Sequence, residues 1–318
     1  MNNLPMPTPT PTDPQSPFKL MSDIELRLRI LFSSLAVART TDFPARILNI
    51  CTDLQHLCET DADAALGILV LGTEVRYTIT HPLHVALLCE LVARKNGVDA
   101  EHRLPILAAA LTCNIAMIEL QDMLQTQQAP LTEEQTTQIR QHPEKAASML
   151  RQAGVQDAVW LDTVLHHHER LDGKGYPGTL SGDDISVPVR IVSLADIYGA
   201  MISPRNYRGA KFSCHTLREA FLKRGAAMDA ALPQLFMDEL GVYPPGAFVT
   251  LNNGETAVVI RRGATAMTPQ AQSVVSPKGA PLPAPLLRDT AEEIYSIRDF
   301  APPSKGLAIK RQILWGYA

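Results

Sequence analysis

The chain has 318 residues, of which 46% are hydrophobic and 5% aromatic, and its formal net charge at pH 7 is −4. So few aromatics favour aliphatic helix packing over a large β-sandwich. The slightly negative charge argues against general binding of nucleic-acid polymers, although a local basic pocket could still hold phosphates. The cysteines are scattered without a CxxC pair, which is typical of a reducing cytosol, so we expect a cytoplasmic protein. No apolar run is expected to span a membrane, and the N-terminus does not resemble a signal peptide.

The N-terminal quarter of the chain divides into two predicted regions. Residues 1–20 are rich in proline and are expected to form a disordered tail. Residues 21–75 are predicted to be helical, with a first helix capped by Ser22 or Asp23, a second starting at 42–44 and a third near 64–69. This region could be a small sensory or dimerising bundle, which makes a homodimer one expectation.

The next predicted helix covers residues 77–95. It is expected to begin near Thr80, because Pro82 is tolerated only close to a helix start. His81 lies at its beginning, and His84 lies one turn further along, on a neighbouring face. Each of these histidines, taken alone, would be interpreted as structural.

Two more helices are predicted before the centre of the chain. An apolar helix is expected over 104–124. Thr132 is expected to cap the following helix, which carries His142. Pro143 should break or restart this helix at 142–143, because a proline inside a helix removes a backbone donor.

The most informative stretch begins with three consecutive histidines, His166-His167-His168, followed by Glu169. A loop with two glycines then ends at Tyr176-Pro177. Imidazole is the commonest side-chain metal ligand, and glycines allow a backbone to approach a ligand closely. Histidines at a helix end followed by a surface turn would be the ordinary alternative, but the whole run indicates a site for metal and phosphate.

Beyond this loop, residues 187–198 predict a long buried helix. Its acid, Asp196, should be paired or bound to metal, since an isolated buried charge is costly. Arg205 and Arg208 follow, and guanidinium groups are suited to phosphate, although an ordinary solvated basic turn would have the same composition. Residues 215–240 are predicted to return to helix.

The C-terminal region has a different pattern. Residues 248–251 and 255–260 alternate around Asn252-Asn253-Gly254, which predicts a β-hairpin. Residues 263–290 are expected to be a loop rich in Ala and Pro, and residues 293–297 could add a strand.

These motifs resemble the HD-GYP family, a branch of the HD metallohydrolase superfamily whose known members cleave cyclic di-GMP. The resemblance covers roughly residues 76–260. The matching residues are His167-His168-Glu169-Arg170, Asp172-Gly173, Gly175-Tyr176-Pro177, Arg190-Ile191, Ala195-Asp196 and Arg205-x-Tyr207-Arg208. The resemblance and the patterns together predict a mainly α fold. Its regions are a disordered tail (1–20), an N-terminal helical region (21–75), a helical HD-GYP domain (76–242) and a small β-rich region (243–318).

The resemblance also implies a set of site residues. His142, His167 and His168 would hold one metal, and His81 and Asp196 would belong to a second. The implied substrate-binding residues are Asp172, Gly173, Gly175, Tyr176, Pro177, Arg190, Arg205 and Arg208.

The chain departs from the family pattern where the adjacent His-Asp pair should stand. Cys113 replaces the histidine, Asn114 the aspartate and Met117 a nearby lysine, while Gly199 stands where a second aspartate is usual. Asn114 is neutral and a poor bridge between two metals. Cys113 could bind a soft metal as a thiolate, but a buried apolar role is the more ordinary one. We therefore expect a single transition metal (Fe, Mn or Zn) rather than a complete pair, and assign no catalytic residue.

Two functions remain open from the sequence. The first is a signalling module, impaired in catalysis, that binds cyclic di-GMP, a related cyclic dinucleotide or a signalling protein through its GYP surface. The second is a metal-dependent cyclic di-GMP phosphodiesterase with reduced activity.

Overall fold

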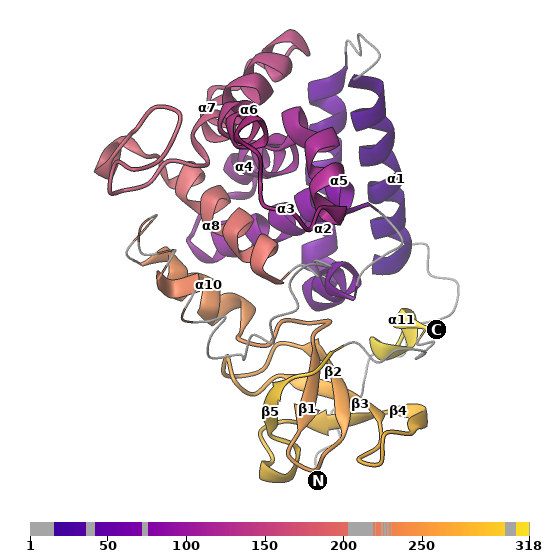
Figure 1. Cartoon of the computed structure of the whole chain (residues 1–318). Coiled ribbons are helices and arrows are strands. Elements are labelled where there is room, and N and C mark those ends of the chain that lie inside the picture. Colours follow the sequence, from indigo (N-terminus) through magenta and orange to yellow (C-terminus); the bar gives the residue numbers. More distant parts are fainter. Residues whose placement is uncertain are drawn as a thin grey trace.

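The computed structural model describes residues 16–35, 42–71, 76–202, 231–302 and 310–317, with 219, 221–223, 225, 227 and 229 between them. The helices of this part are α1 (Pro17–Leu35), α2 (Phe43–Val70), α3 (Tyr77–Lys95), α4 (Ala100–Thr112), η1 (Ile115–Met117), α5 (Ile118–Thr126), α6 (Glu133–Gln152), α7 (Ala158–His166), η2 (Gly182–Asp184), α8 (Val187–Ile202), α10 (Leu232–Leu240), η3 (Glu293–Tyr295) and α11 (Arg311–Leu314). The strands are β1 (Phe248–Leu251), β2 (Thr256–Arg261), β3 (Gln270–Val275), β4 (Pro281–Asp289) and β5 (Ile297–Phe300). Helices make up the upper part of the molecule and a small sheet lies below them (Figure 1), so the predicted mainly α fold is confirmed.

The helices share one hydrophobic core. It joins α1, α2, α3 and α4 to α8 and α10, and it reaches the sheet through Val258 and Ile260 of β2. The N-terminal helices are therefore packed into the same interior as the helices that carry the predicted site. Whether the predicted regions are separate functional units stays a prediction.

The first helix starts earlier than expected. Helix α1 begins at Pro17, inside the predicted tail, rather than at Ser22 or Asp23. A proline fits the first helical position because its missing N–H would be unpaired there anyway. Phe18 and Met21 are buried, which stabilises this added turn. The remainder of the tail, residues 1–15, lies outside the described residues.

The predicted second and third helices are one element, α2, with a kink. Asp61 has non-helical backbone angles within it (φ −160°, ψ 84°). Its carboxylate accepts a hydrogen bond from the backbone N–H of Ala64, as an N-cap would. The kink thus behaves as the start of a second helical segment.

The predicted helix over 104–124 is interrupted. Helix α4 ends at Thr112, and α5 begins at Ile118 after the single turn η1. By length and hydropathy, Ala100–Thr126 could cross a membrane, contrary to the sequence expectation, but 67% of its most apolar window is buried inside the protein. Burial in the core is sufficient to explain its composition.

The C-terminal sheet is antiparallel, with strand order β4-β3-β2-β1-β5. The predicted hairpin is present as β1 and β2, with Phe248 opposite Val258. The predicted loop over 263–290 was wrong, because it contains β3 and β4. Strand β4 is an edge strand, the one sheet position where several prolines are tolerated. The strand expected at 293–297 begins only at Ile297.

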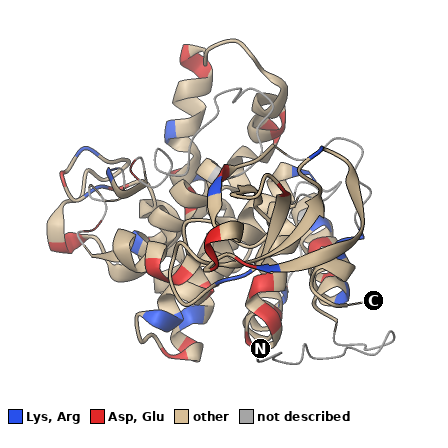
Figure 2. Ribbon diagram, turned by 90° about the horizontal axis from the view of Figure 1, so that it is seen from below, with Lys and Arg blue, Asp and Glu red and all other residues tan. Residues whose placement is uncertain are grey.

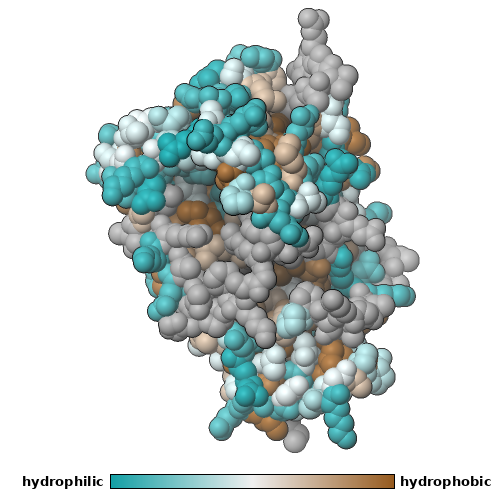
Figure 3. All heavy atoms as spheres, in the orientation of Figure 1, coloured by the Kyte–Doolittle hydropathy of each residue, from teal (hydrophilic) through white to brown (hydrophobic). Residues whose placement is uncertain are grey.

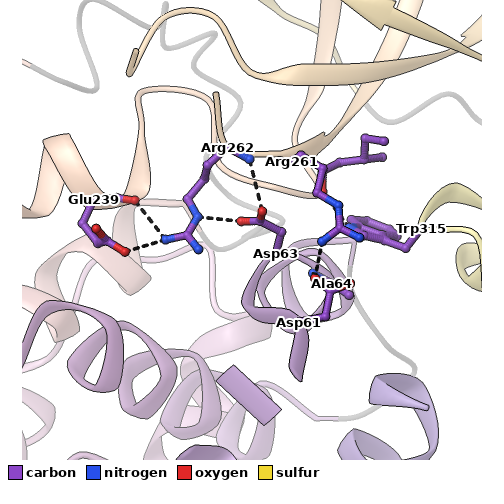
Figure 4. Close-up of polar contacts among 8 residues, drawn as sticks. Asp61, Asp63, Ala64, Glu239, Arg261, Arg262 and Trp315 are labelled. Atoms are coloured by element: carbon purple, nitrogen blue, oxygen red, sulfur yellow. Dashed lines mark hydrogen bonds and ion pairs between the residues drawn. The ribbon is translucent and has the colours of Figure 1, made fainter. Parts of the chain in front are cut away.

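Two consecutive arginines at the end of β2 connect the sheet to the helices (Figure 4). Arg261 bonds the carboxylate of Asp61 at the kink of α2. Arg262 bonds Asp63 at 2.6 Å and Glu239 of α10 at 2.7 Å. The indole N–H of Trp315, from the C-terminal segment, donates to the carbonyl of Ile260 at 2.7 Å.

Charges of both signs are interspersed over the described ribbon (Figure 2). Opposite charges therefore often lie close together. Arg27 of α1 illustrates this, because it contacts Asp23 on its own helix at 2.8 Å and Asp53 of α2 at 2.5 Å. Partly exposed pairs of this kind contribute little to stability, on the order of 0–1 kcal/mol each.

Candidate metal centre

His142 is oriented by the proline that follows it. Helix α6 continues through Pro143, so the predicted break at 142–143 was wrong. Pro143 has no N–H, which leaves the carbonyl of Ile139, four residues earlier, without its usual helical donor. The Nδ1 atom of His142 lies 2.6 Å from that oxygen. A carbonyl can only accept, so Nδ1 carries the hydrogen and Nε2 presents a lone pair.

His167 reaches the same state by a different route. It is the C-cap residue that directly follows α7, where the last carbonyls of a helix have no partner within the helix. Its Nδ1 donates to the carbonyl of Val164 at 2.7 Å, and its own carbonyl accepts from the hydroxyl of Ser193 at 2.6 Å. Its Nε2 is thereby also left as an acceptor. It lies 3.1 Å from Nε2 of His142.

The structure brings together the three histidines predicted for the first metal. One nitrogen from each of His142, His167 and His168 lies within 4.8 Å of the others. Burial, followed by the nearby His168, lowers the pKa of His142 to about 4, and the same two causes hold the pKa of His167 well below its usual range. Neutral imidazoles with facing lone pairs repel one another unless a cation lies between them. The donor set therefore fits a transition metal, which His142, His167 and His168 would hold.

The residues predicted for the second metal bond to one another instead. Nε2 of His81 donates to Oδ1 of Asp196 at 2.9 Å, and the side-chain amide of Asn114 donates to the same oxygen at 3.4 Å. Burial alone would raise the pKa of the Asp196 carboxyl, but the hydrogen bond from His81 and the nearby histidines outweigh it and hold that pKa well below its usual range. The carboxylate is thus compensated by N–H donors.

Cys113 behaves as a buried thiol. It is fully buried, and its sulfur lies 3.7 Å from the carbonyl of Ala110. Burial, together with the charge of Asp196, raises the pKa of this thiol well above its usual value. A thiolate is the form that binds metal, so this environment supports the apolar role over the ligand role.

Gly199 and Met117 are the two other departures from the family pattern. A Cβ added to Gly199 would lie 3.6 Å from Nδ1 of His81. That nitrogen has no hydrogen-bond partner in the described part of the chain. An aspartate at position 199 would therefore stand beside the imidazole edge that is now without an acceptor. Met117 lines a pocket of about 340 Å³ together with Ile118 and Met149 and with the charged residues Glu119 and Lys145.

Glu169 holds the loop with two glycines, and its carboxylate is directed at that loop rather than at a metal. Glu169 is buried and accepts hydrogen bonds from the backbone N–H groups of Gly178 and Leu180. Gly175 passes so close that a Cβ there would lie 2.4 Å from Cα of Glu169. This loop leaves the helices at one side of the molecule (Figure 1), in a region of mainly hydrophilic side chains (Figure 3).

Other predicted substrate-binding residues have protein partners. Asp172 pairs with Arg170 through both oxygens, at 2.9 and 2.7 Å, and this hydrogen bonding lowers the pKa of Asp172 to about 2. Arg190 bonds Asp229 at 3.2 Å and the carbonyl of Ile185 at 2.8 Å. These contacts brace the loop between α7 and α8. Substrate contacts of these two residues stay a prediction.

The remaining predicted substrate-binding residues are placed as follows. Gly173 has a left-handed φ of 69°, and the Tyr176–Pro177 peptide bond is cis. The ring of Tyr176 stacks on that of His168, with centroids 4.8 Å apart. Arg205 and Arg208 lie outside the described residues.

Sequence reasoning missed one residue at this site and undervalued another. The guanidinium of Arg140, two residues before His142, lies over the ring of Tyr176, 5.7 Å from its centroid. Nothing in the sequence distinguishes it from other surface arginines. His84 is buried beside His81 with its Nε2 unpaired in the described structure, and burial followed by the charge of His81 lowers its pKa to about 3.

Comparisons with known proteins show which proteins this chain resembles. A family model described as an HD domain matches residues 69–231. The chain is 30% identical over 223 residues to a cyclic di-GMP phosphodiesterase of Pseudomonas aeruginosa, covering 70% of this chain and 54% of that protein. It is 30% identical over 147 residues to the 3'3'-cGAMP-specific phosphodiesterase 1 of Vibrio cholerae, covering 46% and 34%. The chain thus spans about half the length, or less, of these curated relatives.

The fold also has a counterpart among solved structures. A HDG"Y"P protein from Bdellovibrio bacteriovorus superposes with a TM-score of 0.57 at 14% sequence identity, over 71% of this chain and 73% of that one. At this identity the likeness concerns the fold alone.

Proposed function

The chain belongs to the HD domain family, in its HD-GYP branch, and from this premise we propose that it acts in cyclic di-GMP signalling by binding the nucleotide at a one-metal site with impaired hydrolysis. The main support is the contrast within the site. Three histidine nitrogens are free to face a metal, whereas the residues of the second position hydrogen-bond to one another. The names of the relatives support the substrate class, a cyclic dinucleotide with two purines.

The residues of the chain would divide the work of binding. A metal held by His142, His167 and His168 would supply positive charge to a phosphate. The carbonyls of Ile139 and Val164 keep two of these imidazoles in the tautomer that leaves Nε2 bare. Glu169 holds the loop that carries Tyr176 against the cluster.

Hydrolysis requires more groups in the site than binding does. A phosphodiesterase with two metals clamps both the attacking and the leaving oxygen. Here Asn114 is a neutral donor to Asp196, so it does not supply the anionic bridge that holds a second ion. We therefore propose slow turnover or none, while a protein partner could still contact the GYP loop.

The second candidate is a metal-dependent cyclic di-GMP phosphodiesterase of reduced activity. The specific observation in its favour is the complete set of three histidines, since three imidazoles and a water form a common catalytic site for one metal.

One experiment separates the two candidates. The full chain is purified from cells grown with manganese, iron or zinc in turn. Its metal content, its affinity for cyclic di-GMP and 3'3'-cGAMP, and its turnover of both nucleotides are then measured. We expect about one ion per chain, measurable binding and little product. Two ions with rapid turnover would establish the enzyme and overturn the proposed impairment. A metal-loaded chain that binds neither nucleotide would leave only a protein partner.

A further inference from the structure

A stack of three side chains leads from the histidine cluster to the surface. The ring of His168 stacks on Tyr176, with centroids 4.8 Å apart and planes inclined by 26°. The guanidinium carbon of Arg140 lies 5.7 Å from the centroid of the same Tyr176 ring. A guanidinium over an aromatic ring is held by attraction to the ring face, and it keeps its N–H groups available at its edge.

Arg140 differs in what it contacts from two other arginines near the loop, Arg170 and Arg190. Arg170 is held by Asp172, and Arg190 is held by Asp229 and by backbone carbonyls. Arg140 is exposed and makes no ion pair with the carboxylates of the described part of the chain. Its N–H donors are thus free for an anion.

The position of this charge suits a ligand with two phosphates. A cyclic dinucleotide carries both phosphates in one covalent ring, so when one lies at the metal the other stays nearby. Arg140 is two residues before His142 on α6, and it is separated from His168 by one aromatic ring.

We propose that Arg140 is a substrate-binding residue that holds the second phosphate of a cyclic dinucleotide whose first phosphate lies at the histidine cluster. This inference rests on the proposed function. A planar guanidinium can bind a phosphate with two parallel hydrogen bonds, which a lysine cannot reproduce. Tyr176 contacts both the guanidinium of Arg140 and the ring of His168, so it would position the charge relative to the histidine cluster.

The test uses the metal-loaded full chain and calorimetric titration with cyclic di-GMP, which has two phosphates, and with GMP, which has one. Arg140→Ala should weaken cyclic di-GMP binding by about tenfold or more and change GMP binding by less than about twofold. The affinity of Arg140→Lys for cyclic di-GMP should lie between the affinities of the parent and the alanine variant. The matched control is Arg151→Ala, on the same helix and exposed, about 16 Å further along it. It should leave both affinities unchanged.

Four results would overturn the inference. A parent that binds cyclic di-GMP while Arg140→Ala binds it equally well would refute the role of Arg140 and leave the proposed function intact. An equal loss for GMP would show that Arg140 does not act on a second phosphate. Loss of metal in Arg140→Ala would show a structural role. If the parent binds neither cyclic dinucleotide, the proposed function itself fails, and this inference fails with it.

Discussion

The two halves of the histidine site use the same residue types in opposite ways. In the first half, His142 and His167 each donate Nδ1–H to a backbone carbonyl, so their Nε2 lone pairs face one another at 3.1 Å. In the second half, His81 directs its Nε2 at Asp196 and leaves Nδ1 unpartnered in the described structure. The first half is thus prepared for a cation, whereas the second satisfies its carboxylate from within the protein.

The difference teaches what orients a metal ligand. A histidine becomes a ligand when the rest of the protein holds its other nitrogen, and a backbone carbonyl can do so only where the helix has released it. Pro143 and the end of α7 release such carbonyls in the first half. At Gly199 the second half lacks a side chain that could serve the same purpose for His81.

The largest effect is expected when a histidine of the first half is removed. His167→Ala should weaken metal binding by more than about 100-fold, because losing a ligand should exceed the 10–100-fold cost of losing a group that only orients one. His81→Ala, the matched change in the second half, should leave metal content nearly unchanged. Elemental analysis of both variants checks this, and equal metal loss in the two would erase the proposed distinction between the halves.

The next prediction rebuilds the second half. Cys113→His together with Asn114→Asp should raise metal content from about one ion towards two and restore turnover of cyclic di-GMP with manganese or iron. Neither change alone should suffice, because the two residues act as a unit. Met117→Lys should further strengthen phosphate binding.

Parent, single, double and triple variants are compared in one turnover assay. A parent as fast as the double variant would contradict the impairment. A triple variant that binds two metals yet stays inert would direct attention to Gly199.

A smaller effect is expected in the loop that supports the first half. Gly175→Ala would place a Cβ 2.4 Å from Cα of Glu169, so the loop must shift. Overpacking of this kind costs roughly 1–3 kcal/mol, and it should weaken metal binding by moving His168 and Tyr176. Lys174→Ala, the exposed neighbour, is the control. Urea unfolding and metal titration measure both, and a Gly175→Ala protein that matches the control would show that the loop yields freely.

The smallest effect concerns pH. His84 is 4% exposed, and burial lowers its pKa to about 3. Between pH 6.5 and 3 the unfolded chain binds this proton and the folded chain does not, so folding stability is full above pH 6.5 and falls as pH is lowered. His84→Leu should remove about 1 kcal/mol of the stability difference between pH 6.5 and 5.5, because the unfolded histidine is already half protonated at pH 6.5. Urea titrations at both values check this, and parallel losses in parent and variant would contradict it.

Much of the fold could be anticipated because it depends on local patterns. The hairpin of β1 and β2 was predicted from alternation around an Asn-Asn-Gly turn, and the start of α2 from the residues before Pro44. Local rules failed where distant packing decides. The prolines of β4 indicated a loop, but the edge of the sheet accepts them. Pro143 indicated a break, but the helix continues and His142 uses the released carbonyl.

The sequence by itself determined which chemical groups are available: three histidines with the correct spacing, an acid within a buried helix, and a neutral pair, Cys113 and Asn114, where the family pattern has His-Asp. Residue identity sets charge and ligand type, so these conclusions needed no coordinates. Only the tertiary structure decided which histidine nitrogens are left free for a cation and which are hydrogen-bonded within the protein. His81 and Asp196 are 115 residues apart, and whether they hold a cation or each other depends on how α3 and α8 pack. Hydrogen bonding acts over about 3 Å, so no sequence pattern could settle that choice before the helices were placed.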